Sequence, residues 1–456
     1  MSTRTIINSV ERKSILFIGD LVLIGFSLNS FVNRALNYEG SYQNIEIFLF
    51  LIGLVLYFMI AYVLDLYNLE KTPKSLTYSV LRVFSIVFLF TLFQFTAATL
   101  LFGASFWRSH LFIFMIFCPI QLVLWRLLFN YVFKFVPTNK SVLYLYDEST
   151  LESLEKNVAQ INGVGKETYY KVIATKLNKE ATLDQFDISD EIIKSVDSWI
   201  INTRDYTHFS NTLESKMVDS ILSGKEVLSY ASFYEYSYEA LPVECNNDSI
   251  YELLQLKNTK IRYLQSIVSF NFNFFLTLIT GFFFFLVTPF VFIINLFVNR
   301  GPLFYTQFRV GKYGKEYKIY KFRSMVVDAE NKGAKMATKN DARITSFGKI
   351  LRKFRIDELP QILSVINGDM VFIGPRPERK VFVEKLNTVT PFYNVRHLVK
   401  PGITGWAQVK YKYGENLEDS IKKLEYDLYY IKNKSVLLDI RIIFKTLTTI
   451  LFSRGI

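Results

Sequence analysis

Long apolar runs are separated by polar stretches along this chain, and the first four of them lie close together at its start. They are approximately Ile15–Val32, Ile47–Leu66, Val80–Phe102 and Leu111–Phe135. A membrane-spanning helix needs about 20 predominantly apolar residues, so each run predicts one span. The first run contains Asp20 and has no small-residue cleavage site, which favours a retained span over a cleaved signal peptide. Residues 1–139 are therefore predicted to form a four-helix transmembrane bundle.

Basic residues near the ends of these runs predict the orientation of the bundle. Arg12 and Lys13 precede the first run, Lys74 lies in the loop after the second, and Lys134 and Lys140 follow the fourth. Because Lys and Arg are enriched in cytoplasmic loops, both ends of the bundle are predicted to face the cytoplasm.

Residues 140–260 have the composition of a soluble domain. Predicted strands and helices alternate there, at Val142–Tyr146, Leu151–Ile161, Tyr169–Ala174, Ser198–Ile201 and Thr207–Leu222. This alternation is typical of a small α/β layer, so we expect a Rossmann-like cytoplasmic domain. Gly163 and Gly165 do not lie between the first strand and its helix, as a dinucleotide-binding loop requires. A structural or regulatory domain is favoured over a cofactor-binding one.

The third region, residues 261–456, opens with another apolar run, Phe270–Val298, which contains Thr288-Pro289. A straight helix over this run would be about 40 Å long at 1.5 Å per residue, enough to cross a bilayer. Pro289 removes a backbone donor and predicts a sharp kink. The helix either crosses the membrane or bends at Pro289 and returns, as a re-entrant helix over about residues 268–298. Residues 300–355 contain 15 Lys and Arg against 4 Asp and Glu, which favours the re-entrant path beside the anionic cytoplasmic leaflet.

Composition narrows the class of protein further. Half of the residues are hydrophobic, the formal net charge is +12 and the pI is about 9.3. A basic membrane protein of this kind suggests an anionic partner, such as nucleic acid, anionic lipid or a phosphorylated substrate. With only two cysteines, and three histidines without metal-ligand spacing, the chain has neither a disulfide framework nor a zinc-binding pattern.

The segment from Ser346 to Gln361 is the strongest candidate for chemistry. Ser346 can cap a short basic helix that ends near Phe354, and a second helix can begin at Asp357-Glu358 with Pro360 in its first turn. On its own, an acidic pair at this position is most simply explained as a helix cap that complements the helix dipole.

The residues around Asp357 and Glu358 change that interpretation. Many cations or rigid motifs occur nearby in the sequence: Lys321 and Arg323, then Arg352, Lys353 and Arg355, then Gly374-Pro-Arg-Pro377, and finally Lys400-Pro-Gly-Ile-Thr-Gly-Trp-Ala-Gln408. Arginine matches phosphate oxygens in bidentate geometry. A carboxylate that attacks a diphosphate must overcome like-charge repulsion, which arginines and a magnesium ion can offset. The pattern therefore predicts a membrane-associated site for an anionic substrate.

Six ordered motifs carry a resemblance to a known family. They are Lys321-Phe-Arg-Ser-Met325, Leu351-Arg352 followed by Asp357-Glu-Leu-Pro-Gln361, Asn367-Gly-Asp-Met370, Gly374-Pro-Arg-Pro377, Pro401-Gly-Ile-Thr-Gly-Trp-Ala-Gln408 and Tyr426-Asp-Leu-Tyr-Tyr430. From about Ser266 to Ile456 the chain resembles the bacterial sugar transferases, also called monotopic phosphoglycosyl transferases. The N-terminal layout resembles the larger exopolysaccharide-type members.

The resemblance implies a mainly helical catalytic domain and roles for individual residues. Asp357 stands at the position of the family's nucleophile, and Glu358 at that of the residue that helps to hold Mg²⁺. Substrate-phosphate binding is implied for a cationic and polar set: Arg352, Arg376, Lys321, Arg323 and Gln408. Thr288 and Pro289 stand where the family breaks its re-entrant helix. The apolar stretch Val436–Phe452 resembles an interfacial helix.

The implied reaction transfers a sugar 1-phosphate from a UDP-sugar to undecaprenyl phosphate through a covalent aspartyl intermediate. Nucleophilic catalysis of this kind splits one transfer into two displacements and gives ping-pong kinetics. The resemblance further implies membrane lipids as partners, a location in the bacterial inner membrane with the catalytic domain on the cytoplasmic face, and a first membrane step in exopolysaccharide, capsule or O-antigen assembly. A homodimer is compatible with the larger relatives.

Other classes fit the sequence less well. A metal-dependent glycosyl transferase that moves the sugar alone usually needs an Asp-x-Asp pair, and none stands in a suitable loop. No Gly-x4-Gly-Lys-Ser/Thr loop of a kinase or ATPase is present. The basic stretch is adjacent to a membrane helix and lacks a nucleic-acid-binding motif, so nucleic acid is not expected as a partner. A non-enzymatic membrane scaffold for polysaccharide assembly remains the alternative, and it would release no UMP from a UDP-sugar.

Overall fold

The computed structural model describes residues 9–35, 43–64, 66–67, 76–102, 108–133, 140–163, 170–178, 188–203, 211–243, 262–327, 329, 341–411 and 416–451. The chain forms two compact units, Met1–Tyr230 and Ala231–Ile456. The predicted boundaries at residues 139 and 260 stay predictions. Cys245, His208, Gly165, Lys74 and Lys134 lie outside the described residues.

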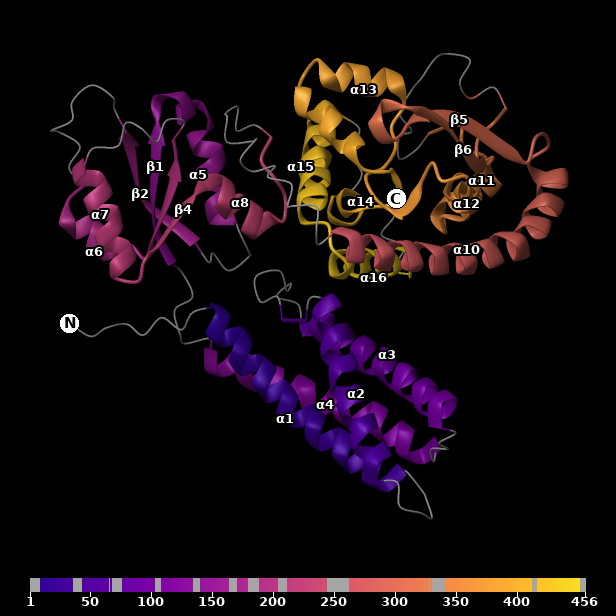
Figure 1. Cartoon of the computed structure of the whole chain (residues 1–456), viewed down its shortest axis with the longest axis horizontal. Coiled ribbons are helices and arrows are strands. Elements are labelled where there is room, and N and C mark those ends of the chain that lie inside the picture. The colour runs from indigo at the N-terminus through magenta and orange to yellow at the C-terminus, as the bar shows by residue number, and fades with distance from the viewer. Residues whose placement is uncertain are drawn as a thin grey trace. The chain divides into compact units, whose positions relative to one another are not determined.

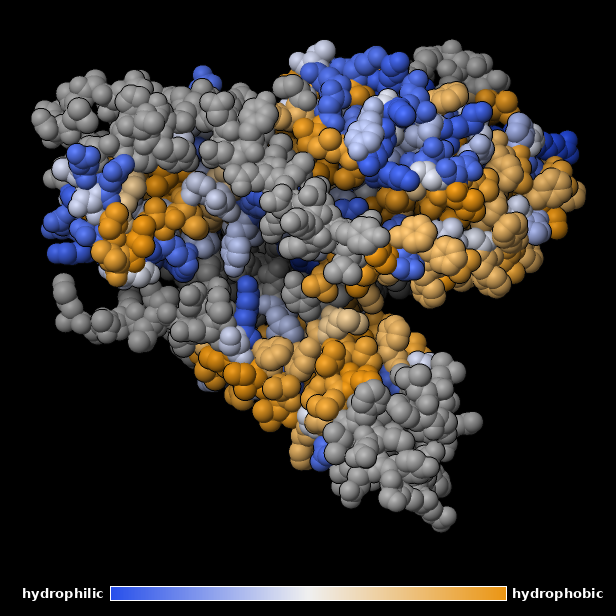
Figure 2. Space-filling model, viewed as in Figure 1, coloured by the Kyte–Doolittle hydropathy of each residue, from blue (hydrophilic) through white to orange (hydrophobic). Residues whose placement is uncertain are grey.

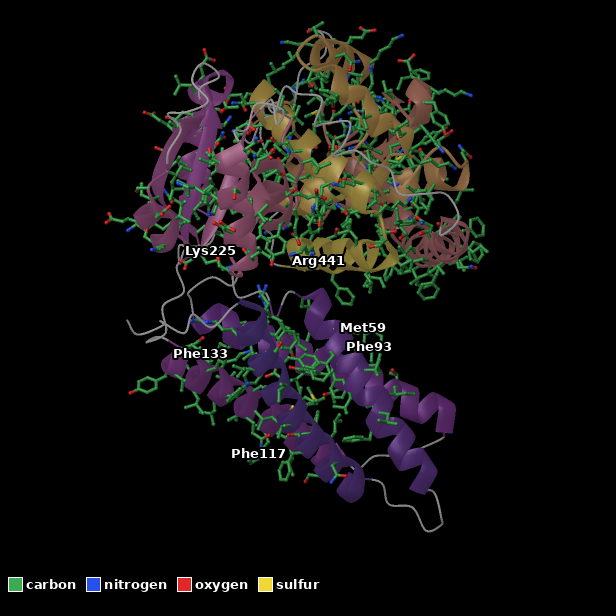
Figure 3. The ribbon with its side chains drawn as sticks, turned by 60° about the vertical axis from the view of Figure 1, so that its left-hand side comes forward. Met59, Phe93, Phe117, Phe133, Lys225 and Arg441 are labelled. Carbon is green, nitrogen blue, oxygen red and sulfur yellow. The ribbon has the colours of Figure 1, made fainter. Side chains whose placement is uncertain are left out.

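Four long helices stand where the four N-terminal apolar runs predict them (Figure 1). They are α1 (Ser9–Ala35), α2 (Gln43–Val63), α3 (Leu76–Phe102) and α4 (Arg108–Phe133). Leu28, Tyr57 and Phe90 are among the residues at the centre of their shared core. Phe93 and Phe117, labelled in Figure 3, are exposed on the outside. A bundle with an apolar core and an apolar exterior is suited to lipid rather than water.

Three helices in the described part of the chain contain stretches that are long and apolar enough to cross a membrane. These are Arg12–Ser30 in α1, Phe112–Phe133 in α4 and Ile267–Val298 in α10 (Arg262–Val298). The described residues of α2 and α3 contain the shorter apolar stretches Phe50–Ala61 and Val80–Gln94. The chain is therefore a membrane protein, while the exact number of spans in the bundle stays a prediction.

Asp20, the acidic residue in the first apolar run, forms a buried ion pair. Both Nη atoms of Arg126 on α4 donate to its carboxylate, at 3.0 and 2.7 Å, and the hydroxyl of Tyr67 donates at 2.7 Å. Ionisable side chains inside a membrane are costly unless they are paired, so this pair fixes α1 against α4. The polar position in the first run is explained by packing within the bundle.

A four-stranded parallel sheet with the order β2-β1-β3-β4 follows the bundle in sequence. Its strands are β1 (Lys140–Asp147), β2 (Tyr170–Asn178), β3 (Ser198–Asn202) and β4 (Glu226–Ser229). The helical segments of this layer are η1 (Glu148–Ser153), α5 (Leu154–Gly163), α6 (Asp190–Ser195) and α7 (Asn211–Leu222). The next helix, α8 (Tyr230–Tyr238), belongs to the second unit except for its first residue. Leu143, Trp199 and Met217 belong to the core of this layer. The expected small α/β layer is thus present, while its Rossmann-like character and cytoplasmic location stay predictions.

The second unit is built mainly of helices and two small sheets. After α10 come an antiparallel hairpin, β5 (Phe304–Val310) and β6 (Glu316–Phe322) with η2 (Lys312–Gly314) between them, and then α11 (Ser346–Lys353), η3 (Ile356–Gln361) and α12 (Ile362–Ile366). The rest is β7 (Val371–Ile373), α13 (Lys380–Asn387), η4 (Pro391–Leu398), β8 (Gly402–Thr404), α14 (Trp406–Lys410), α15 (Leu417–Asn433) and α16 (Val436–Leu451), with β7 parallel to β8.

Helix α10 is continuous through Pro289 and bends towards its C-terminal end in Figure 1. The hydroxyl of Thr288 donates to Phe284 O at 2.5 Å, a local bond of the kind that often bends helices. Phe270, Phe285 and Phe297 are all more than 70% exposed, and Figure 2 shows hydrophobic surface along this helix. So much exposed aromatic surface indicates contact with lipid. The re-entrant path over residues 268–298 stays a prediction.

Candidate active site

The acidic pair lies at the junction of two short helices. Thr345 caps α11, because its hydroxyl accepts a hydrogen bond from Gly348 N at 3.0 Å. The predicted cap, Ser346, is therefore wrong by one residue. The sequence alone allows either hydroxyl to cap the helix, but the extended backbone that a cap residue requires is found at Thr345. Arg355 then adopts a left-handed backbone conformation, with φ of 58°, and turns the chain into η3. Asp357 and Glu358 lie in the first turn of η3, and both are buried.

Glu358 is held by three cations. Its Oε1 accepts from Lys321 Nζ at 3.0 Å and from Arg376 Nη2 at 2.9 Å, and its Oε2 from Arg355 Nη1 at 3.3 Å. Burial opposes ionisation of this carboxyl, but Lys321, Arg376 and Arg355 outweigh burial and hold its pKa well below the usual range. Glu358 is therefore a fixed carboxylate that orients three cations around the site.

Asp357, the adjacent residue, has the opposite environment. Its Oδ1 is buried and has no hydrogen-bond partner among the described residues. Burial raises the pKa of Asp357, and the charge of Glu358 adds to that rise, while Lys321 and Arg352 oppose it. An unpaired buried carboxylate oxygen is energetically costly in isolation, which is a common property of residues at functional sites.

The loop that carries Arg376 is fixed by close backbone contact. Gly374 N donates to Thr404 O and Gly402 N donates to Pro375 O, each at 2.9 Å. A Cβ on Gly402 would lie only 2.1 Å from Gly374 N, so the two segments can approach this closely only without a side chain there. The two glycine-proline motifs of the sequence thus form one rigid unit that presents Arg376 to Glu358.

A cavity of about 450 Å³ opens beside Asp357. Its wall is strongly cationic, with ten basic side chains against three acidic ones: Arg309, Lys321, Arg323, Arg343, Arg352, Arg355, Arg376, Arg379, Arg396 and Lys423 against Asp357, Glu378 and Asp427. Apolar and aromatic side chains, including Phe322, Phe382 and Tyr393, complete the lining. The size and the charge suit an anionic organic molecule of small to medium size.

All five residues predicted to bind substrate phosphate line this cavity: Lys321, Arg323, Arg352, Arg376 and Gln408. Arg323 also has a structural partner, since its Nη2 donates to Asn295 Oδ1 at 3.3 Å and to Asn299 O at the end of α10. Gln408 on α14 donates to Ile403 O at 3.0 Å, while its buried Oε1 has no partner among the described residues. The structure brings the predicted residues together, and their roles towards a substrate stay predictions.

Sequence reasoning missed a second group of residues in the cavity wall. Arg396 pairs with Asp427 at 2.9 Å and donates to Arg376 O at 2.7 Å, so it supports the backbone of a predicted site residue. Arg309 Nη1 lies 3.6 Å from Glu378 Oε2, and both residues line the cavity. Asp427 stands within the motif Tyr426-Asp-Leu-Tyr-Tyr430 noted in the sequence analysis, and this motif was the one sequence feature that could have pointed to it. Arg396 and Arg309 have no comparable signal in the sequence.

The side chains fit a magnesium ion only together with a substrate. In the described part of the chain, no three His, Cys, Asp or Glu residues are grouped as metal ligands. Magnesium is, however, commonly held by one or two carboxylates plus substrate phosphates. The unpaired Oδ1 of Asp357, with Glu358 beside it, provides such carboxylates.

Most of the second unit is similar in sequence to known proteins. Residues 264–453 match the family model described as bacterial sugar transferase. A UDP-N-acetylgalactosamine-undecaprenyl-phosphate N-acetylgalactosaminephosphotransferase of Aeromonas hydrophila is 51% identical over 157 residues, which are 34% of this chain and 37% of the relative. A UDP-glucose:undecaprenyl-phosphate glucose-1-phosphate transferase of Escherichia coli strain K12 is 45% identical over 150 residues, 32% of each chain.

A shorter relative is matched over most of its length. The exopolysaccharide production protein PSS of Rhizobium leguminosarum bv. phaseoli is 38% identical over 175 residues, which are 36% of this chain and 86% of that protein. By contrast, this chain matches only about a third of the length of the two larger relatives. The segments matched in these three relatives are each about a third of this chain.

Proposed function

Because this chain belongs to the bacterial sugar transferase family, we propose that it is a phosphoglycosyl transferase that moves a hexose 1-phosphate from a UDP-sugar to undecaprenyl phosphate. Two relatives carry names with that acceptor, one with an N-acetylgalactosamine donor and one with a glucose donor. The single observation that supports this proposal best is the buried, unpaired Oδ1 of Asp357 in the wall of a cationic cavity.

In the first half-reaction, Asp357 acts as the nucleophile. One of its carboxylate oxygens forms a bond to the β-phosphorus of the UDP-sugar, while the bond from that phosphorus to the bridging oxygen breaks. The electron pair leaves with UMP, and the sugar phosphate stays on Asp357 as an acyl phosphate. Lys321, Arg352 and Arg376 line the cavity and provide charge that offsets the repulsion between the carboxylate and the diphosphate.

In the second half-reaction, a phosphate oxygen of undecaprenyl phosphate attacks the same phosphorus. The bond to Asp357 breaks, the carboxylate is restored, and the product is a sugar-diphosphate lipid. The two displacements share one nucleophile, so the kinetics are ping-pong. The lipid acceptor is supplied from the bilayer, consistent with the exposed phenylalanines of α10.

Glu358 stays ionised throughout, because its three cations hold its pKa low. In this proposal it orients Lys321, Arg355 and Arg376, and Glu358 and Asp357 are the residues that would hold a magnesium ion together with the substrate phosphates. When bound, Mg²⁺ supplies positive charge at the diphosphate oxygens. We further propose that the catalytic unit acts on the cytoplasmic face of a bacterial inner membrane, in the first membrane step of polysaccharide assembly.

The test is an assay of the purified protein in nanodiscs with undecaprenyl phosphate, Mg²⁺ and a panel that includes UDP-glucose and UDP-N-acetylgalactosamine. We expect UMP release together with labelled lipid for at least one donor, and loss of both with EDTA. UDP release instead of UMP would indicate transfer of the sugar without its phosphate. No nucleotide release from any donor, by a folded protein, would contradict the proposal and favour a membrane scaffold.

A further inference from the structure

A short segment upstream of the family match is an integral part of the second unit. The match begins at residue 264, whereas the compact unit begins at Ala231. The described residues of the upstream segment, Ala231–Val243, include most of α8 and the turn that follows it. We call these residues the strap.

Glu239 of the strap contacts both ends of α14 and the neighbouring helix α16. Trp406 Nε1, at the start of α14, donates to Glu239 O at 2.9 Å. Lys410, at the end of α14, forms an ion pair with the Glu239 carboxylate. Arg441 on α16, labelled in Figure 3, binds the other carboxylate oxygen at 2.8 Å. Glu239 therefore holds both ends of α14.

The aromatic ring of Trp406 joins these contacts into one cluster. Lys410 Nζ lies 4.7 Å from the ring centroid and the guanidinium of Arg441 lies 5.2 Å from it. Trp406 is fully buried. Glu239 itself adopts a left-handed backbone conformation with φ of 54°, which is uncommon for a residue with a side chain. Such a conformation persists only where the surrounding contacts determine it, and Trp406, Lys410 and Arg441 supply those contacts.

Further contacts anchor the strap to α15. Tyr234 donates to Glu425 Oε2 at 2.8 Å, and Leu241 N donates to Glu425 O at 3.0 Å. Leu241 and Val243 are buried in a core with residues of α13 and α15. At the far end of α15, Glu235 pairs with Lys432 at 2.7 Å. The strap is thus fixed independently of α14, and so it can serve as a support for that helix.

Helix α14 is the element that needs such support. It has five residues, and helices this short are not stable in isolation, so its position depends on tertiary contacts. It presents Ala407 and Gln408 to the cavity beside Asp357. Any loosening of α14 would therefore move one wall of the candidate active site.

We infer that Glu239 is a positioning residue, which acts through α14 to hold Gln408 and Ala407 in the cavity wall. The functional catalytic unit of this chain accordingly begins at the strap rather than at the start of the family match. Because Glu239 contacts Trp406, Lys410 and Arg441 and does not line the cavity, it supports the wall without touching substrate.

Hydrogen exchange of the full-length protein tests this inference without any assay of activity. The amides of Val409 and Tyr411 donate to Gly405 O and Ala407 O, so they report on α14. Glu239→Ala should speed their exchange at least about tenfold, the change expected if opening becomes about 1.4 kcal/mol easier. Glu239→Gln should have a smaller effect, because both variants keep the bond from Trp406 to the backbone carbonyl but only the glutamine side chain can still accept a hydrogen bond.

Glu235→Ala is the matched control, since Glu235 lies on the same strap but contacts Lys432 and Asn433 on α15. It should leave exchange at Val409 and Tyr411 unchanged. Equal acceleration by both variants, or none by Glu239→Ala, would overturn the inference. Should Glu239→Ala not fold, two milder variants give the same comparison. Glu239→Gln removes both ion pairs of Glu239, and Lys410→Met removes one of them.

A kinetic test of the role of Glu239 is also possible, and it rests on the proposed function. If Glu239 acts through α14, Glu239→Ala should raise KM for the UDP-sugar several-fold, and should add little in a Gln408→Ala background. Additive effects would overturn the inference. Local acceleration of exchange, in a protein that releases UMP from no donor, would leave the role of Glu239 standing while removing the proposed function.

Discussion

Asp357 and Glu358 are adjacent in the sequence, yet their carboxylates have opposite surroundings. Three cations hold Glu358, whereas Asp357 Oδ1 is buried without a partner. The pKa of Asp357 is correspondingly raised, and that of Glu358 is lowered. Two carboxyl groups pushed in opposite directions by their environments usually have different roles. One is suited to react, and the other to organise charge.

Asp357→Asn should remove transfer and leave the fold intact. If Asp357 is the nucleophile, release of UMP should fall by more than about 10³-fold, as for other enzymes that lose a nucleophile. Because burial disfavours the ionised form of Asp357, the neutral amide should not lower the melting temperature. UMP release and thermal unfolding, measured on the same preparation, check both statements. Substantial UMP release by a pure sample of this variant would exclude Asp357 as the nucleophile.

Acidification should inactivate the enzyme before it unfolds. If Asp357 is the nucleophile, it must react as a carboxylate. Its pKa lies above the ordinary value of 3.8, so the rate should fall as pH drops through that raised pKa. Between 3.8 and the raised pKa, the folded state binds more protons at Asp357 than the unfolded state, so protonation there does not destabilise the fold.

The contribution of Glu358 to folding stability depends on pH in the opposite way to that of Asp357. Its lowered pKa means that its contribution is present above the ordinary value of 4.5 and is lost only as pH falls through the lowered pKa. Single-turnover release of UMP and circular dichroism should therefore be measured over the same pH series. Loss of activity that coincides with unfolding would contradict this separation of the two carboxyl groups.

Glu358→Gln should damage both activity and stability. The amide cannot balance Lys321, Arg355 and Arg376, so their mutual repulsion should destabilise the fold by about 1–3 kcal/mol, after allowance for partial exposure of the cations. Activity should fall about 10²-fold or more because the cations lose their orientation. Chemical denaturation and kinetics check these values. Glu316→Gln, on the exposed end of β6, is the control and should change neither.

The candidate site could be predicted in part from sequence because its key residues lie in short, rigid motifs. The cations Lys321, Arg352 and Arg376 were identifiable from glycine, proline and charge patterns, and all three line the cavity. The apolar runs likewise predicted α1 to α4, since hydrophobic length is a local property.

Contacts between segments far apart in the sequence could not be predicted from such local patterns. Arg396 reaches Arg376 O and Asp427 only because η4, α15 and the loop after β7 meet in the fold. Glu239 contacts Trp406 across more than a hundred residues of sequence. No local periodicity encodes such a pairing. The cap of α11 was misplaced for a smaller reason, because Thr345 and Ser346 carry equivalent hydroxyls and only the backbone angles separate them.

Arg323 offers a test between two roles for one residue. It lines the cavity, but its guanidinium is directed to Asn295 and Asn299 O at the C-terminal end of α10, where a cation also complements the helix dipole. Arg323→Ala should therefore lower the melting temperature and leave a buried carbonyl without its donor, at about 1–3 kcal/mol. KM for the UDP-sugar should change less than in Arg352→Ala. A larger KM effect than that of Arg352→Ala, with no loss of stability, would assign Arg323 to phosphate binding.

Pro289 should control the path of α10 through the bilayer. In a helix interior, proline prevents one backbone hydrogen bond, and the local bond from Thr288 to Phe284 O adds to the tendency to bend. Pro289→Ala restores the missing donor and should straighten the helix. If α10 follows the re-entrant path predicted from the sequence, this variant should shift it towards spanning. Single cysteines placed at exposed Lys315 or Lys349 should then become partly labelled from the opposite side of sealed vesicles. Thr288→Val, which removes the side-chain bond but keeps the proline, should have a smaller effect. Unchanged labelling in Pro289→Ala would mean that Pro289 does not set the path, and that the basic stretch after α10 holds the catalytic unit on its side of the membrane.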